Sequence, residues 1–429
     1  MPIPAPAQLA WQQAELGVVF HYDIHQFDGL RYRQVDNRRT LWNDANLFAP
    51  ALLDTDQWVA AAKAAGARFA ILTASHETGF RLWQSDANPF CLKATSWGDG
   101  KRDLVAEFVD SCRRADIQPG IYMGARWNGQ LGVLNFRVTE ASTISQAEYN
   151  HLIEAEVEEI CSRYGDLFEL WFDGGILSAE DGGPDVLPIF EKYQPNSLYY
   201  HSDQRRDVRW GGTESGTVGD PCWATVDLER IETGEDRHDS VRDYLRHGDP
   251  DGNAWCPAMS DAPLRNHEWF WEPGDEHKIE PLDRLVEMYY QSVGRNSTLI
   301  LGATPDDRGL MPEADVIRLA EFGQEMARRL SHTIAQTSGE GDVVDLPFPR
   351  ASRIDHVVIQ EDIRQGERVR GYEVEAVTQA GARVVASGSC IGHKALHEIP
   401  PLTADGLRLR VTAHDATPLV RNFAAVCSE

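Results

Sequence analysis

Polar and aromatic side chains that could bind or cleave a sugar follow a series of short apolar runs. These side chains are His21, the pair His76-Glu77, Trp127 between Arg126 and Asn128, Asp173, and His201. Imidazoles and carboxylates hydrogen-bond hydroxyl groups, aromatic rings pack against the apolar face of a sugar, and two carboxyl groups can cleave a glycosidic bond. If the apolar runs are strands whose ends meet, the pattern predicts a carbohydrate-hydrolysing site.

Asp173 has the sequence context of a catalytic nucleophile. It follows the apolar run 167–172 and precedes two glycines, which free the backbone for a tight turn and leave open space before the carboxylate. A nucleophile needs such access to its substrate. The alternative is that Asp173 caps the next turn, because Asp-Gly is common after a strand.

The runs that would position these residues alternate with segments of helical period, a pattern typical of parallel strands covered by helices. We expect strands at 17–20, 68–73, 120–123, 167–172, 197–201 and 298–301. From about 202 to 280 the periodicity fades into a polar region rich in Gly and Asp. Several βα units in a segment of this length favour a TIM-like (β/α)8-type barrel over an open sheet, with its active site at the C-terminal ends of the strands.

The chain changes character after about residue 335. Residues 331–345 read as a polar connector, and four later segments alternate apolar and polar residues at period two: 354–360, 369–376, 383–386 and 407–412. Such alternation predicts antiparallel strands with one buried face. We therefore expect a catalytic barrel over residues 1–335 and a C-terminal antiparallel β-sandwich over residues 345–429.

The charge balance restricts the partners of the chain. Lys and Arg number 41 against 67 Asp and Glu, a formal net charge of −26, which would repel phosphate backbones and anionic lipids. No run approaches the roughly 18 apolar residues of a membrane span, and the start lacks the basic and apolar regions of a signal peptide. We expect no nucleic-acid or membrane partner and a cytoplasmic location, unless a leader was removed; the oligomeric state stays open.

Other hydrolase chemistries lack their signatures. The seven cysteines are scattered and never form a CxxC pair, which predicts reduced thiols and no zinc knuckle. HExxH is missing, and His76-Glu77 has no second ligand at a fixed spacing, so we expect no metal and no cofactor. No GxSxG follows a strand, which disfavours a Ser-His-Asp hydrolase.

With these motifs in view, the chain resembles the α-L-fucosidases of glycoside hydrolase family 29. Four motifs carry the resemblance in collinear order between residues 10 and 330: AGARFAILTASHETGFRLW at 65–83, LWFDGG at 170–175, DVRWGGTESG at 207–216 and SVGRNSTLILGATP at 292–305. The family also carries a β-sandwich after its barrel.

The resemblance implies a retaining exo-glycosidase that removes terminal α-L-fucose from an oligosaccharide or glycoside by double displacement. Asp173 would be the nucleophile and Glu214 the acid/base, with their carboxyl groups about 5–5.5 Å apart. Without the resemblance, Glu214 reads as a solvated loop glutamate.

The resemblance also implies a set of sugar-binding residues. They are His21, His76, Trp171, Arg265, Trp269 and Trp271. The histidines would bind hydroxyl groups as neutral imidazoles, and the tryptophans would form an apolar wall. For the three tryptophans, core packing is the alternative.

One departure from the family pattern bears on the identity of the sugar. The second histidine of the family's HHDGF motif is Glu77 here, and a carboxylate accepts more hydrogen bonds than a neutral imidazole. We therefore retain two alternatives to a fucosidase: a related α-L-glycosidase acting on an α-L-glucoside or α-L-galactoside, and a catalytically silent carbohydrate-binding protein.

Overall fold

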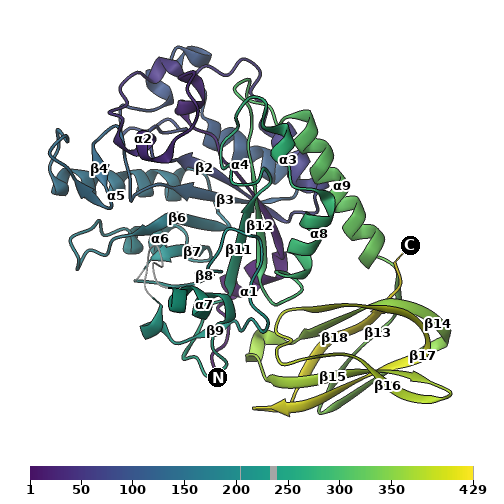
Figure 1. Cartoon of the computed structure of the whole chain (residues 1–429). Coiled ribbons are helices and arrows are strands. Elements are labelled where there is room, and N and C mark those ends of the chain that lie inside the picture. The colour runs from purple at the N-terminus through teal and green to yellow at the C-terminus, as the bar shows by residue number, and fades with distance from the viewer. Residues whose placement is uncertain (203, 232–238, 429) are drawn as a thin grey trace.

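The computed structural model describes residues 1–202, 204–231 and 239–428, and the side chains of 239 and 240 are not described. Its larger part is an eight-stranded sheet in the order β7-β6-β3-β2-β1-β12-β11-β8, in which neighbouring strands run parallel throughout the described residues. The strands are β1 (Leu16–Phe20), β2 (Phe69–Ser75), β3 (Gln118–Met123), β6 (Glu169–Ile176), β7 (Leu198–Ser202), β8 (Arg209–Trp210), β11 (Ala258–Pro263) and β12 (Thr298–Ala303). The sheet curls into a nearly closed barrel whose ends are β7 and β8 (Figure 1).

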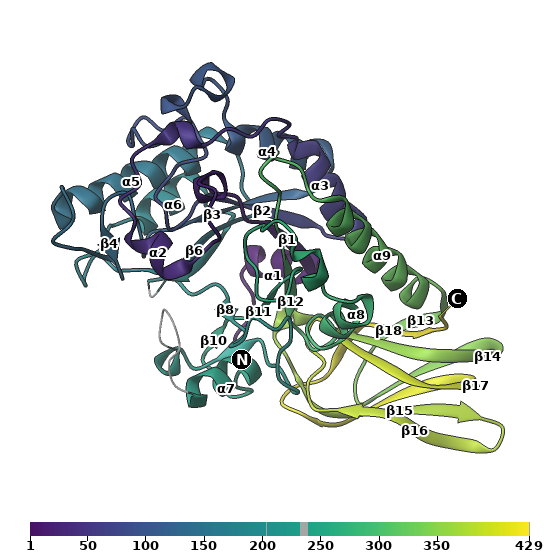
Figure 2. The ribbon, with the colours of Figure 1, turned by 45° about the horizontal axis from the view of Figure 1, so that its top comes forward.

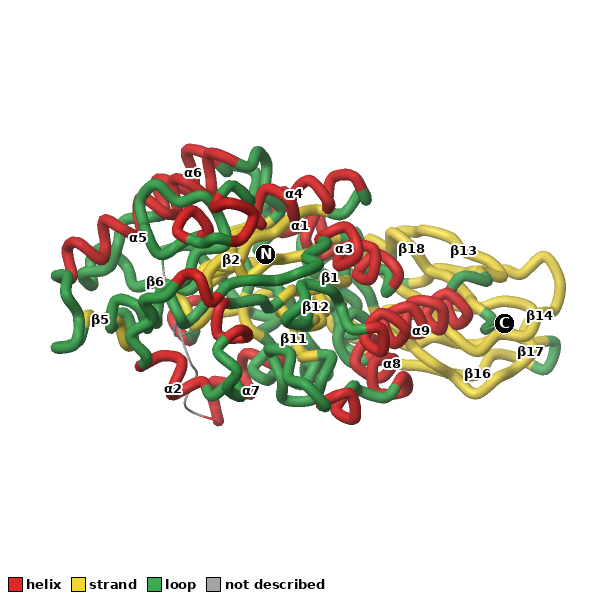
Figure 3. The backbone as a smooth tube through the Cα atoms, turned by 90° about the horizontal axis from the view of Figure 1, so that it is seen from above, coloured by secondary structure: helices red, strands yellow, loops and turns green. Residues whose placement is uncertain are grey.

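Most of the helices lie around the outside of this sheet, as the view from above shows (Figure 3), whereas α1 (Pro6–Ala14) packs its Trp11 into the buried cluster of the barrel interior. The other helices are α2 (Gln34–Arg39), α3 (Thr55–Ala64), α4 (Leu104–Arg114), α5 (Gln146–Arg163), α6 (Leu187–Tyr193), α7 (Asp239–His247), α8 (Leu282–Tyr290) and α9 (Glu313–Leu330). Side-chain caps explain several of the starts: Asp54 accepts hydrogen bonds from the N–H groups of residues 56 and 57, and Asp103 from that of residue 106. The short strands are β4 (Val133–Leu134), β5 (Arg137–Val138), β9 (Thr225–Val226) and β10 (Ala254–Trp255).

Side chains, rather than a channel, fill the interior of the barrel. Val19, Ile71, Tyr122, Trp171 and Ile300, each from a different strand, belong to one buried cluster. Because the helices cover the outer faces, whole strands such as β2 and β12 are buried on both sides. In the described residues, no helix is long and apolar enough to cross a membrane.

The six strands predicted from apolar runs are confirmed within a few residues. The prediction was incomplete between 202 and 280, where the barrel takes two more strands, β8 and β11. β8 pairs with β11 through only two register positions, too few for a periodic pattern. β11 reads AMSDAP, a mixture of small and polar residues whose burial depends on the barrel around it.

The C-terminal region is a six-stranded antiparallel sheet in the order β13-β18-β14-β17-β15-β16. Its strands are β13 (Thr333–Glu340), β14 (Val343–Glu361), β15 (Val369–Thr378), β16 (Gly381–Gly388), β17 (Ala395–His414) and β18 (Leu419–Val426). The expectation of a polar connector over 331–345 was wrong, because β13 and the start of β14 occupy it as strands.

Two long strands fold this sheet into a sandwich-like body. The first half of β14 pairs with the second half of β17, and the second half of β14 pairs with the first half of β17 and with β18. Irregularities in register fall between these halves, at 347–352 and 354–356. The body lies beside the barrel below α8 and α9, away from the C-terminal ends of the barrel strands (Figure 2).

Candidate active site

Side chains from three barrel strands, β3, β6 and β11, and from adjoining segments surround one narrow cavity. Its lining residues are His21, Tyr32, Gln34, His76, Glu77, Tyr122, Trp171, Asp173, Glu214, Asp261 and Trp269. About 70 Å³ is open to the centres of water molecules, room for roughly five waters at 10–15 Å³ each. A space of this size suits one sugar ring whose hydroxyl groups displace those waters.

Asp173 enters the cavity from a bulge in β6. Trp171 is opposite Tyr200 of β7, but the next pairing joins Ile176 to Ser202, so the backbone between them leaves the ladder. Gly174 and Gly175 have φ of 63° and 90° there, a conformation that side chains disfavour. The predicted tight turn after Phe172 is therefore a bulge within a longer strand.

The charge of Asp173 is balanced by its neighbours. Burial raises the pKa of this carboxyl, while a hydrogen bond from the Tyr122 hydroxyl to Oδ2 (2.9 Å) and the positive charges of Arg38 and Arg126 oppose the rise. The hydrogen bond from Tyr122 and the two positive charges favour the ionised form, in which a carboxylate can act as a nucleophile.

Glu214 lies on the loop that follows β8. Both sides of the loop are held by β11: Gly211 N–H donates to the Met259 carbonyl (2.7 Å), and Gly216 N–H donates to the Asp261 carbonyl (2.8 Å). The Glu214 side chain is exposed at the mouth of the cavity, where the Trp269 indole N–H donates to its Oε2 (3.1 Å). Partial desolvation of the carboxyl at the cavity mouth raises its pKa, and the nearby negative charge of Asp173 adds to the rise.

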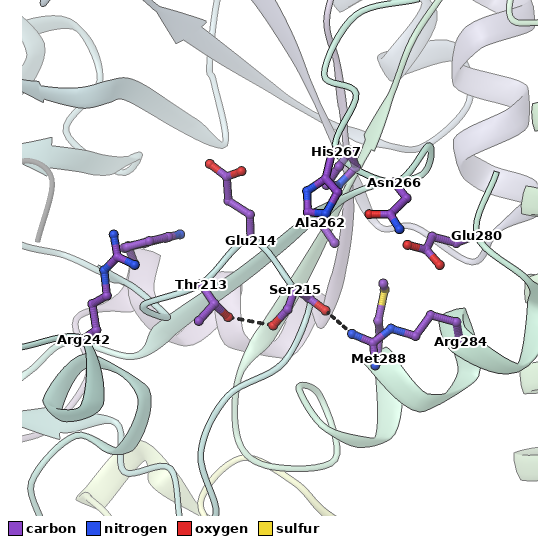
Figure 4. A pocket seen from close by; sticks show the side chains of 12 residues that line it. Thr213, Glu214, Ser215, Arg242, Ala262, Asn266, His267, Glu280, Arg284 and Met288 are labelled. Atoms are coloured by element: carbon purple, nitrogen blue, oxygen red, sulfur yellow. Dashed lines mark hydrogen bonds between the residues drawn. The ribbon is translucent and has the colours of Figure 1, made fainter. Parts of the chain in front are cut away.

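Glu214 also borders a second, wider cavity. This one offers about 650 Å³ to the centres of water molecules, and Glu214 is the residue that both cavities share. Figure 4 shows Glu214 beside this space, with Arg242 on one side and Asn266, Glu280 and Arg284 on the other. The two carboxyl groups therefore differ in location. Asp173 lines only the narrow cavity, whereas Glu214 lines both cavities.

Two buried histidines form part of the narrow cavity. Burial lowers the pKa of His21 to about 3 and that of His76 well below its usual value, so both imidazoles are neutral. The His76 ring stacks on Tyr122 with centroids 5.5 Å apart, and both histidines contact the buried ring of Phe270. The Nδ1 atoms of both histidines and Nε1 of Trp171 lack a hydrogen-bond partner within the described chain. Such nitrogen atoms can form hydrogen bonds with hydroxyl groups.

Glu77 lines the cavity with both oxygens already engaged. Arg38 Nε donates to Oε1 (2.6 Å) and the Tyr32 hydroxyl to Oε2 (3.1 Å). Burial raises its pKa to about 7, against the opposing effect of Arg38. The Arg38 guanidinium also stacks on Trp127, 3.5 Å from the ring centroid.

Three of the residues predicted to bind sugar lie outside the lining of this cavity. Trp127 stacks on Arg38 instead, and Trp271 is half-buried beyond Phe270. Arg265 is fully buried, and its Nε donates to both oxygens of Asp315 in α9 (3.2 and 3.1 Å). The Arg265 side chain therefore connects the segment after β11 to α9. Its place before Trp269 in the sequence did not indicate this contact.

The sequence interpretation missed four lining residues. Tyr122 and Asp261 lie on β3 and β11, Tyr32 precedes α2, and Gln34 is the first residue of α2. Tyr122 was within reach of sequence reasoning, because it pairs with Trp171 in the register of β3 and β6 and belongs to the same interior cluster. Asp261 had no such signal, since β11 itself was not recognised.

In sequence and in fold, the chain is similar to α-L-fucosidases. A family model described as α-L-fucosidase matches residues 6–329. α-L-Fucosidase 1 of Arabidopsis thaliana is 28% identical over 439 residues, covering 92% of this chain and 81% of its own. The crystal structure of a Bacteroides thetaiotaomicron VPI-5482 protein assigned to the α-L-fucosidases is 49% identical with a TM-score of 0.95, and all of both chains is covered. A glycoside hydrolase 29 family member from a rumen bacterium is 27% identical with a TM-score of 0.83, covering 100% of this chain and 78% of the other.

Proposed function

The chain belongs to the α-L-fucosidase family, glycoside hydrolase family 29, and we propose that it hydrolyses terminal α-L-fucosides with retention of configuration, using Asp173 and Glu214. Its activity as a glycoside hydrolase follows from the family. The observation that carries the assignment of the two residues is that they line one cavity of the size of a single sugar, from different strand ends.

In the first step, the Asp173 carboxylate attacks the anomeric carbon while Glu214 donates its proton to the departing glycosidic oxygen. The C–O bond to the leaving group breaks as the bond to the Asp173 oxygen forms. In the second step, Glu214, now ionised, takes a proton from a water molecule that attacks the same carbon and releases Asp173. The raised pKa of Glu214 favours the protonated state that the first step needs.

The two cavities support this division of roles. Fucose would occupy the narrow cavity, with hydroxyl groups at His21 and His76 and an apolar face against Trp171 or Trp269. The leaving group would extend from Glu214 into the wide cavity. One sugar on one side and ample space on the other is the arrangement of an enzyme that removes terminal residues.

Replacing the nucleophile tests the first role. Asp173→Ala should lower kcat on an aryl α-L-fucoside by at least about a thousandfold, because no covalent intermediate can form. Azide should restore part of the activity and yield β-L-fucosyl azide, since it attacks from the face that Asp173 occupied. Asp185→Ala, at an exposed position before α6, is the matched control and should stay active. Near-normal turnover by Asp173→Ala would contradict the assignment.

Replacing the acid/base tests the second role. Glu214→Ala should lower kcat/KM by about 10²–10⁴-fold for substrates with poor leaving groups, such as oligosaccharides, and far less for a dinitrophenyl fucoside, which leaves without a proton. The matched control is Glu180→Ala, an exposed loop carboxyl. An equal loss on both kinds of substrate would show that Glu214 is not the acid.

A related L-hexose is the second candidate for the substrate, and Glu77 is the observation that favours it. This carboxyl lies in the narrow cavity where the family motif has a histidine, so it could bind a hydroxyl group that fucose lacks. α-L-Galactosides, which carry an oxygen at C6, are the substrates to compare with fucosides.

A further inference from the structure

A fourth carboxyl group, that of Asp261, lines the narrow cavity together with those of Glu77, Asp173 and Glu214. It belongs to β11, is 5% exposed, and accepts a hydrogen bond at Oδ1 from the indole N–H of Trp210 (2.9 Å). Neither step of the proposed mechanism uses it. A buried carboxyl beside the reacting groups, held by a specific donor, calls for a role of its own.

Asp261 contacts the loop of Glu214 through two connections. Its backbone carbonyl accepts from Gly216 N–H (2.8 Å), two residues after Glu214. Its side chain holds Trp210, the last residue of β8, from which the loop starts. The loop that carries Glu214 is thus attached to Asp261 on both sides.

The rest of the loop is held through residues other than Glu214, including a hydrogen bond from Arg246 to the Thr213 hydroxyl (3.2 Å) and one between the hydroxyl groups of Ser215 and Thr217 (2.8 Å). Thr213 and Ser215 hydrogen-bond to each other through their hydroxyl groups (2.7 Å), and Arg284 donates to the Ser215 carbonyl (3.0 Å). Glu214 itself is exposed, with its hydrogen bond from Trp269 at the cavity mouth. Together with the hydrogen bond from Gly211 to Met259, the attachment points at Trp210 and Gly216 hold the two ends of the loop that carries Glu214.

From this geometry we infer that Asp261 is a positioning residue for the acid/base: its hydrogen bond from Trp210 holds the loop 211–216 so that Glu214 reaches the glycosidic oxygen. The inference rests on the proposed role of Glu214. Asp261 does this as a neutral carboxyl, because burial and then the charge of Glu214 raise its pKa well above the usual value, and the carbonyl oxygen of a neutral acid still accepts the indole proton.

The neutral state makes asparagine a close replacement. Asp261→Asn keeps an acceptor oxygen for Trp210 and should retain at least about half of the wild-type kcat/KM on an oligosaccharide substrate. Asp261→Ala removes the acceptor and should cost roughly tenfold to a hundredfold on poor leaving groups, as expected for an acid that is displaced by about 1 Å. The loss on a dinitrophenyl fucoside should be only a few-fold, with KM nearly unchanged.

Trp210→Phe tests the same hydrogen bond from the other side, at a half-buried site where the ring is kept. It should reproduce the dependence on the leaving group. The double variant, Asp261→Ala with Trp210→Phe, should lose no more kcat/KM than the less active single variant, because both changes remove the same hydrogen bond.

Ser260→Ala provides the matched control, because successive residues of a strand point to opposite faces. Ser260 is buried next to Asp261, and within the described chain its hydroxyl has no hydrogen-bond partner. It should leave the leaving-group dependence unchanged.

Several outcomes would overturn the inference. They are a loss in Asp261→Asn as large as in Asp261→Ala, equal losses on both kinds of substrate, or additive losses in the double variant. If Glu214→Ala itself shows no dependence on the leaving group, the proposed function fails first, so the two failures are distinguishable.

Discussion

Among single residues, Glu77 separates this site most clearly from the family pattern. Both of its oxygens have partners, Arg38 and Tyr32, so only its remaining lone pairs can accept from a sugar. Arg38 belongs to α2 and stacks on Trp127, so Glu77 is connected through Arg38 to this helix and to Trp127. Trp127 thus stays connected to the site without lining it.

Glu77→His tests whether this residue selects the sugar. A neutral imidazole restores the family motif and removes a carboxylate that could accept a hydrogen bond from the hydroxyl group at C6. The ratio of kcat/KM for aryl α-L-fucoside over aryl α-L-galactoside should therefore rise about tenfold, the value of one hydrogen bond of roughly 1.4 kcal/mol. Glu77→Gln keeps the shape and serves as the control for charge. An unchanged ratio in Glu77→His would mean that Glu77 does not contact the sugar.

Among the elements, β6 performs two tasks along its length. Its bulge near the C-terminal end presents Asp173, and Gly174 is needed there, because a Cβ would lie 2.9 Å from Arg126 and 3.0 Å from Trp127. At its start, Glu169 is 1% exposed and accepts from the Trp11 indole of α1 (2.7 Å). Glu169 therefore holds the start of β6 against α1, whereas the other end of the strand is irregular and carries the proposed nucleophile Asp173.

Glu169 should make the stability of the fold depend on pH. Burial raises its pKa to about 7, whereas the unfolded chain has a value near 4.3. Between these values the folded state keeps the proton and the unfolded state loses it, so this group lowers stability as pH rises from about 4.5 to 7. Glu169→Gln keeps an acceptor for Trp11 and should stabilise the protein more at pH 8 than at pH 5, by about 1–3 kcal/mol.

Urea unfolding of both proteins at the two pH values measures this difference. Glu180→Gln, which removes an exposed carboxyl, controls for the change in net charge. If Glu169→Gln gave the same gain at both pH values, ionisation of Glu169 would have no part in stability.

In the whole molecule, the antiparallel body is fixed to the barrel by buried polar contacts. Glu367 accepts from the Ala224 N–H (3.0 Å to each oxygen) and from the Asn296 amide (2.5 Å). Glu15 pairs with His393 and Lys394; burial opposes its charge, yet these two partners lower its pKa to about 2. None of these contact residues lines the narrow cavity.

The sequence by itself determined the barrel strands with long apolar runs, the helices between them and the antiparallel C-terminal region, and its motifs led to the proposal of Asp173 and Glu214 as the reacting pair. These features depend on local periodicity, on caps and on short motifs, which neighbouring residues encode. Only the tertiary structure decided that β8 and β11 complete the sheet, that Arg265 pairs with Asp315, and that Tyr122 and Asp261 join the cavity. Such facts depend on which distant segments pack together, because the burial of a short or polar strand comes from its neighbours in space.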